Sequence, residues 1–205
     1  MRKIWSLALG VALLTLTSCL GIESRLDIRG DGSGTLSLTY RISRRFVELG
    51  RNEGEPLVVP VPVSREDFVR ALAGADGVEL KAFRRTQDEK DVTIRADLAF
   101  SSLEALSRLE AFREMDARIS ASGSLHTFSQ LIMKAAAEPV TADSRRMLDE
   151  LFDGYDLAYT VTAPGPIQSS SAGTVLSADR RTLTFKTTIR DLVSRTEDLV
   201  LSLSW

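Results

Sequence analysis

Alternation of apolar and polar residues is the feature that most constrains the fold of this 205-residue chain. Over residues 22–28, every second side chain from Ile22 to Ile28 would lie on one face of an extended strand, with charged residues between them. The alternation resumes over residues 36–42, after a cluster of Gly, Asp and Ser residues at 30–34. Two alternating runs joined by such a cluster predict a β-hairpin.

The same signals predict the rest of the chain as further strands and single helices. Strands are expected at residues 78–85, 92–100, 117–121, 125–134, 155–163, 174–177, 182–188 and 199–205. Helices are expected from Ser64, with Phe68, Val69 and Leu72 on its apolar side, from Ser101, over residues 141–152 and near Asp191. A loop is expected at residues 169–173. Residues 125–134 also fit helical spacing. Because strands dominate and hairpins join them, we predict an α+β fold, mainly an antiparallel sheet of hairpins with about three helices packed on it.

Composition and charge exclude several classes of protein. The chain is 43% hydrophobic and 26% charged, which is ordinary for a globular domain and excludes a wholly disordered chain. A formal net charge of −2 argues against nucleic-acid binding through phosphate neutralisation. One Cys and one His leave no disulfide framework and little for a zinc site, and motifs such as Gly-x-Ser-x-Gly are absent. We therefore predict no catalytic residues, no cofactor and no metal site.

Residues 1–18 have the composition of a secretion signal. Arg2 and Lys3 give a positive start, and residues 4–16 contain no charge. A helix of that length spans roughly 20 Å, which is too short for a hydrocarbon core of about 30 Å. The segment is therefore predicted to be cleaved rather than to remain as a transmembrane helix.

Leu16-Thr17-Ser18-Cys19 resembles the lipobox of bacterial lipoproteins, in which an aliphatic residue and two small residues precede a Cys. The resemblance implies cleavage between Ser18 and Cys19 and a diacylglycerol on the Cys19 sulfur. The alternative is an ordinary secretion signal in which Cys19 is incidental. The predicted organisation is a signal peptide at 1–18, a lipidated Cys with a very short tether at 19–21, and a single domain at 22–205.

Three stretches of the mature region carry a further resemblance. They are the Asp31-Gly32-Ser33-Gly34 turn soon after the Cys, the join at residues 100–104, and the end of a late strand at residues 163–167. Together they resemble the LppM-type envelope lipoprotein domain. The resemblance implies an envelope domain without catalytic residues to transfer.

Pairs of adjacent Arg residues are the candidate ligand-binding residues, because guanidinium groups bind phosphate in a bidentate manner. The candidates for contact with anionic headgroups are Arg44, Arg45, Arg84, Arg85, Arg145, Arg146, Arg180 and Arg181. The alternative is a solvated surface. Within a strand, each pair can offer only one Arg to a given face.

Two other motifs have simpler explanations. Arg29-Gly30-Asp31 spells an integrin-binding tripeptide, but Gly and Asp are also the residues that a hairpin turn requires. His126 is the single His and is expected to be an exposed or hydrogen-bonded strand residue.

The distance between the expected anchor and the first strand is short. Only Leu20 and Gly21 separate Cys19 from Ile22, which allows a reach of roughly 10 Å. We therefore expect the domain to lie against its membrane with one surface facing lipid. The predicted function is a non-enzymatic envelope lipoprotein that binds a lipid or amphiphile at the membrane surface.

Two other functions stay open. An assembly subunit could dock on an envelope protein through residues 57–63, an apolar segment with Pro at alternate positions. A hydrolase would need a cleft in which two carboxylates converge. The expected location is the cell envelope, and Leu20 after Cys19, in place of an Asp, favours the outer membrane in a cell with two membranes.

Overall fold

The computed structural model describes residues 20–44, 62–109, 117–135 and 154–205. The strands in these ranges are β1 (Leu20–Ile28), β2 (Gly34–Ser43), β3 (Val78–Gln87), β4 (Asp91–Phe100), β5 (Arg118–Ser122), β6 (Leu125–Met133), β7 (Asp156–Thr162), β8 (Ser169–Ser170), β9 (Thr174–Leu176), β10 (Thr182–Thr188) and β11 (Leu199–Ser204). The helices are α3 (Arg65–Ala71), α4 (Leu103–Ser107) and α7 (Ile189–Val193). This composition confirms the α+β prediction.

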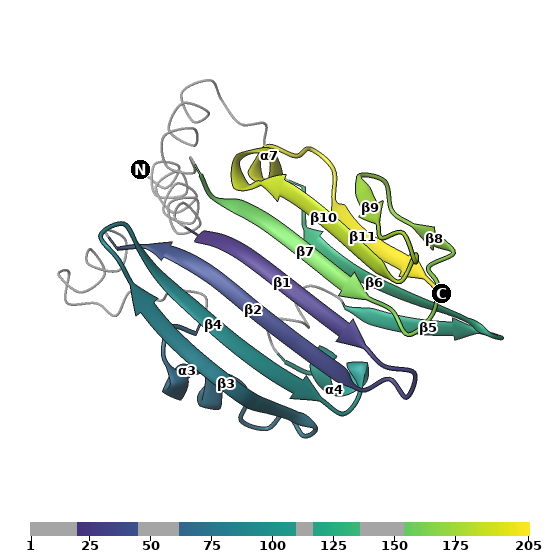
Figure 1. Ribbon diagram of the computed structural model, residues 1–205, viewed down its shortest axis with the longest axis horizontal. Helices are drawn as coiled ribbons and strands as arrows, with labels where there is room; N and C mark the ends of the chain where they lie inside the picture. The colour runs from purple at the N-terminus through teal and green to yellow at the C-terminus, as the bar shows by residue number, and fades with distance from the viewer. Residues whose placement is uncertain (1–19, 45–61, 110–116, 136–153) are drawn as a thin grey trace, which may run out of the picture.

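The strands form two sheets (Figure 1). The larger sheet has the order β3-β4-β2-β1-β7-β10-β9, and the smaller has the order β5-β6-β11-β8. Neighbouring strands are antiparallel except β1 and β7, which pair in parallel from Ile22 opposite Leu157 to Asp27 opposite Thr162. The predicted hairpins β1–β2 and β3–β4 are present, and β5 and β6 form a further one. β6 is a strand rather than a helix.

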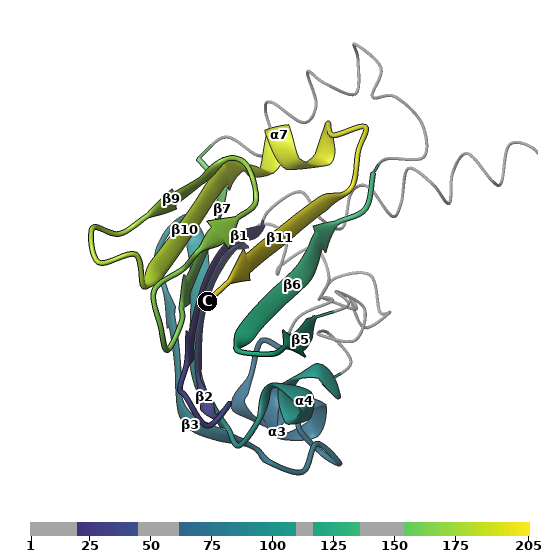
Figure 2. The same cartoon turned by 90° about the vertical axis from the view of Figure 1, so that its right-hand side faces the viewer.

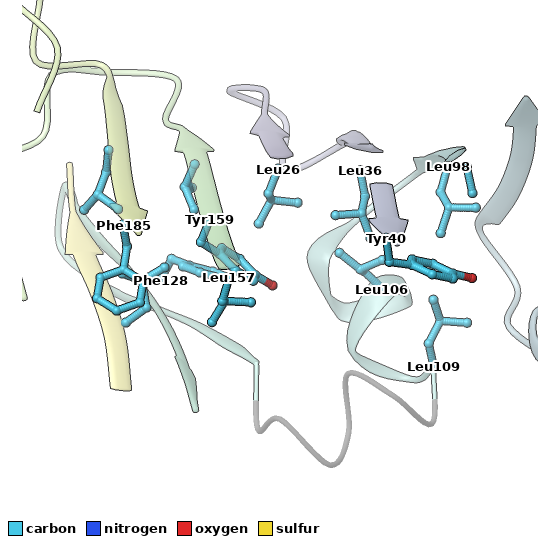
Figure 3. Close-up of a cluster of buried hydrophobic side chains, with 14 of the residues drawn as sticks. Leu26, Leu36, Tyr40, Leu98, Leu106, Leu109, Phe128, Leu157, Tyr159 and Phe185 are labelled. Atoms are coloured by element: carbon cyan, nitrogen blue, oxygen red, sulfur yellow. The ribbon is translucent and has the colours of Figure 1, made fainter. Parts of the chain in front are cut away.

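The larger sheet is curved, and its concave side holds the smaller sheet, α3 and α4 (Figure 2). No described helix or strand lies over its convex face (Figure 2). The buried side chains of both sheets and of the helices form one hydrophobic core, in which Leu26, Leu36 and Phe128 are almost inaccessible to solvent (Figure 3). A curved sheet with one apolar face needs such a cover, and two different layers provide it here.

Side-chain capping fixes the start of all three described helices, and Thr188 provides the cap of α7. Ser64 and Asp67 form the reciprocal capping box expected for α3. The predicted cap of α4 was wrong by one residue, because the Ser102 side chain accepts the hydrogen bond from the Ala105 N–H. The backbone of Ser101 is occupied elsewhere, since its N–H donates to the Gly77 carbonyl.

Other predictions need correction or lie outside the described ranges. Val69 was expected on the apolar side of α3 but is 57% exposed, whereas Phe68 is buried and its ring centroid lies 5.6 Å from that of Phe83. Ser169 and Ser170, expected in a loop, pair with the last strand. The helix expected at residues 141–152 lies outside the described residues, as do residues 57–61.

Polar side chains also join the two sheets inside the core. The Tyr159 hydroxyl of β7 donates to the Gln130 Oε1 of β6 at 2.8 Å, and both residues are buried. Burial raises the pKa of Tyr159 above its usual range, so this phenol is neutral and can donate. A buried polar pair tolerates few other arrangements, so the contact favours one alignment of the smaller sheet on the larger.

Close packing at Gly34 gives a test of the first hairpin. A Cβ at Gly34 would collide with the backbone carbonyl of Asp27 and with the ring of Phe100. We expect Gly34→Ala to lower the free energy of unfolding by about 1–3 kcal/mol. Gly30→Ala is the matched control, because a Cβ at Gly30 meets nothing within 4 Å, and its effect should stay within about 0.5 kcal/mol. Urea denaturation measures both, and equal effects would contradict this packing.

Candidate membrane-facing site

The first strand begins directly after the predicted lipidation residue. Leu20 is the first residue of β1 and pairs with Ile42, and Gly21 pairs with Arg41. The two residues expected to form a tether are therefore the first two residues of the larger sheet. Consecutive Cα atoms are about 3.8 Å apart, so Cys19 and the sheet are adjacent along the chain.

Several strand ends lie together beside the start of β1. The register places Leu20 opposite Ile42 of β2, Ser43 opposite Asp91 of β4, and Ile22 opposite Leu157 of β7. We call this side of the larger sheet the anchor end; it is at the left in Figure 1. The turn between β1 and β2 lies at the opposite end of the same strands.

A buried carboxylate organises the anchor end. Asp91 is 4% exposed and accepts a hydrogen bond of 2.6 Å from the Tyr155 hydroxyl. Arg41 Nη1 lies 3.6 Å from the other Asp91 oxygen, and Arg41 Nη2 donates to the Gly154 carbonyl at 2.8 Å. The guanidinium also lies 5.3 Å from the centroid of the Tyr155 ring. Arg41 is thus held in place while its side chain stays 42% exposed.

Gly21 packs beneath this cluster. A Cβ at Gly21 would lie 3.4 Å from Tyr155 Cδ1 and 3.5 Å from Arg41 Nη2, and Gly21 itself is buried. The second residue after Cys19 is therefore enclosed by side chains from β2 and from the segment before β7. This packing leaves the start of β1 little freedom to move relative to the sheet.

The turn between β3 and β4 adds a further cation. Lys90 Nζ lies 5.6 Å from the centroid of the Tyr155 ring. Asp88 Oδ1 accepts hydrogen bonds of 2.8 Å from the N–H groups of Asp91 and Lys90. These two bonds, that from Asp91 first, lower the pKa of Asp88, which keeps its carboxylate ionised and the turn ordered.

The structure separates the predicted Arg pairs. Arg44 lies at the anchor end, where its backbone N–H donates to the Lys90 carbonyl at 2.9 Å. Arg180 and Arg181 lie at the opposite end, before β10, and the Arg180 guanidinium donates to the Ile167 carbonyl at 2.8 and 3.0 Å. Arg45, Arg145 and Arg146 lie outside the described residues. The described Arg pairs therefore do not converge on one site.

Arg84 and Arg85 point to different faces of β3. Arg85 is paired with Ile94, a core residue, whereas Arg84 is paired with Arg95 on the convex face. Sequence reasoning missed Arg95 because it has no Arg neighbour in the sequence. The hairpin itself contains the signal, since a turn at residues 88–90 sets Arg84 opposite Arg95.

The other sequence motifs have the structural roles expected of them. Asp31 accepts hydrogen bonds from the Ser33 hydroxyl at 2.7 Å and the Ser33 N–H at 3.0 Å, and Gly32 has a φ of +80°. This turn chemistry explains the Gly and Asp at the hairpin tip. His126 is exposed in β6, and its ring is stacked with that of Trp205 at 5.9 Å between centroids.

A small cavity lies between the layers in the part of the chain that the structure describes. This cavity, lined by Leu26, Leu103, Leu106 and Phe128 among others, has a volume of about 10 Å³, enough for one water molecule. In the described ranges, no three His, Cys, Asp or Glu side chains are grouped as metal ligands would be. None of the described helices has the length and apolar character needed to cross a bilayer.

Comparison with known proteins adds no relative to this picture. No protein-family model matches the chain, and no curated protein matches it. The resemblance of the mature region to the LppM-type domain therefore stays a prediction.

Two buried Tyr residues provide a test of the anchor-end cluster. The Tyr155 hydroxyl donates to a carboxylate, whereas that of Tyr159 donates to a neutral amide. We expect Tyr155→Phe to lower the free energy of unfolding by about 1.5–3 kcal/mol and Tyr159→Phe by about 0.5–1.5 kcal/mol. Urea denaturation of both variants at neutral pH measures the difference. A Tyr155→Phe variant as stable as the unsubstituted protein would contradict the role given to Asp91.

Proposed function

We propose that this chain is a non-enzymatic lipoprotein of the cell envelope, held by acylated Cys19, that binds lipid at the surface of its own membrane. The observation that carries the proposal is the position of β1. This strand begins at Leu20, immediately after the lipobox Cys, and Gly21 is packed beneath Tyr155 and Arg41. A lipid on Cys19 would therefore attach to the end of a central strand of a folded sheet and not to a flexible linker.

Acylation would supply the energy of attachment. Each buried CH₂ of an acyl chain contributes about 0.8 kcal/mol, and two or more chains give lasting attachment. The fold would determine how the domain is positioned on the membrane. With an acylated Cys19, the anchor end would lie no farther from the headgroups than the length of a few residues. The charges of Arg41 and Lys90 would then be close to the headgroups.

Contact at the surface has more support than enclosure of a lipid. The cavity between the layers, at about 10 Å³, is far too small for an acyl chain, whereas ligand pockets usually measure about 300–1,000 Å³. No described helix or strand lies over the convex face of the larger sheet (Figure 2). We therefore place the lipid contact on the outside of the protein. In a cell with two membranes, Leu20 after Cys19 favours the outer membrane.

The assembly-subunit alternative has one observation of its own. All five residues of β5, at the edge of the smaller sheet, are exposed, and exposed strand edges can pair with a strand of another protein. Of the segment first considered for docking, residues 57–63, only Pro62 and Val63 are described. Crosslinking in cells that recovered one partner protein in constant proportion would favour this alternative.

The state of Cys19 tests the proposed function directly. We expect mass spectrometry of the membrane-bound protein to find Cys19 as the first residue, with a diacylglycerol on its sulfur. Cys19→Ser should prevent both the acylation and the cleavage at Ser18, because the modifying enzymes need the thiol. An unmodified Cys19 in the mature protein, or a protein released in full from the cells, would contradict the proposal.

A further inference from the structure

We propose that Arg84 and Arg95 together bind the phosphate of an anionic phospholipid in the leaflet that holds Cys19. The inference rests on the proposed function and identifies the chemical group that the membrane-facing surface recognises. It does not require the Arg pairs of the sequence to converge.

The two arginine residues lie side by side on adjacent strands. Arg84 of β3 and Arg95 of β4 are direct cross-strand partners, so their Cβ atoms are about 4.5–5.5 Å apart. Both residues are exposed, and neither forms an ion pair or a side-chain hydrogen bond with any residue that the structure describes. Like charges placed directly opposite each other destabilise a sheet. An anion between them would remove that repulsion and accept hydrogen bonds from both.

Hydroxyl groups and a third cation surround the pair on the same face. Thr86 and Thr93 are cross-strand partners one step nearer the anchor end, and Thr39 of β2 is opposite Arg95. Arg41 of β2 is opposite Thr93 of β4, so Arg41 is a diagonal neighbour of Arg95. Cations therefore extend across three adjacent strands, from Arg84 through Arg95 to Arg41. We call these three residues the arginine track.

Acidic residues lie on both sides of this track. Asp91 is buried and occupied by Tyr155 and Arg41. Glu23 lies 3.9 Å from Arg25, its partner on β1. Asp97 shares the convex face with Arg95 but lies two residues farther from the anchor end. Asp88 and Glu89 lie in the β3–β4 turn at the anchor end, where the charges of Lys90 and Arg41 act on Asp88. A headgroup would therefore approach the arginines from the convex face and not from the anchor end.

The track is also within reach of the membrane. Adjacent strands are about 4.8 Å apart, so β4 and β3 lie roughly 10 and 14 Å to the side of β1. Glu23, four residues after Cys19, is in the same cross-strand row as Arg95, which places that row about 13 Å along the sheet. A sheet that lies with its convex face toward the bilayer therefore presents Arg84 and Arg95 to the headgroups.

Binding of the processed but unacylated chain to vesicles tests the proposed phosphate site independently of the lipid anchor. Residues 19–205 with Cys19→Ser are mixed with vesicles of phosphatidylcholine, or of phosphatidylcholine with phosphatidylglycerol. We expect binding only to the second kind, and a decrease in binding as salt is added. Arg84→Gln and Arg95→Gln should each lower the partition coefficient about fivefold. Arg181→Gln, which removes the same charge at the opposite end, should change it less than about twofold.

The outcomes distinguish binding at a specific phosphate site from the general attraction between cationic side chains and an anionic membrane. Equal losses for Arg84→Gln, Arg95→Gln and Arg181→Gln would overturn the proposal, as would equal binding to both kinds of vesicle. Soluble glycerol phosphate that bound as tightly as the vesicles would contradict the assignment to lipid. The assay needs no acyl chain, so the finding of an unmodified Cys19 would be a separate failure, of the proposed function.

Two further readouts complete the test. Arg84→Gln should raise the melting temperature in low salt by removing the repulsion with Arg95, whereas Lys81→Gln should not, because Lys81 is paired with Glu79.

For the acylated protein in vesicles, a polarity-sensitive dye on Thr86→Cys should report a less polar environment when phosphatidylglycerol is present. The same dye on Arg181→Cys should not change. An unchanged signal at position 86 would overturn the proposal even if the unacylated chain failed to fold.

Discussion

The position of β1 in the middle of the larger sheet is the constraint on which the rest of the structure depends. β1 pairs with β2 on one side and with β7 on the other, so it joins the first hairpin to the C-terminal half of the described chain. Its inward residues Leu26 and Ile28 are buried in the core that both sheets share. A strand held on both edges along its length cannot leave without breaking the sheet. A lipid attached directly before it would thus be attached to the centre of the fold.

Buried polar contacts add specificity to this arrangement. Asp91 with Tyr155 fixes the anchor end, and Gln130 with Tyr159 aligns the smaller sheet on the larger. A buried carboxylate or amide without a hydrogen-bond partner would destabilise the fold, and the hydrogen bond from each Tyr offsets that cost. Alternative alignments would leave a carboxylate or an amide without its hydrogen bond. The pairs therefore favour one arrangement of the layers more than they add to overall stability.

The sequence predicts the local part of this fold and not the long-range part. The hairpins of β1 with β2 and of β3 with β4 follow from alternation and turn residues, because both strands of each hairpin are neighbours in the sequence. The parallel pairing of Ser24 with Tyr159, and the division into two sheets, depend on contacts between distant segments. The site divides in the same way. Arg84 was found as half of an Arg doublet, whereas Arg95 and Arg41 join it only through cross-strand register.

The distance between the protein and the bilayer tests the central claim most directly. Neutron reflectometry of the acylated protein on a supported bilayer measures the protein density above the headgroups. A sheet that begins at Leu20 predicts protein density in direct contact with the headgroup layer. A water-filled gap wider than about 10 Å would exceed what three extended residues can span and would contradict the account.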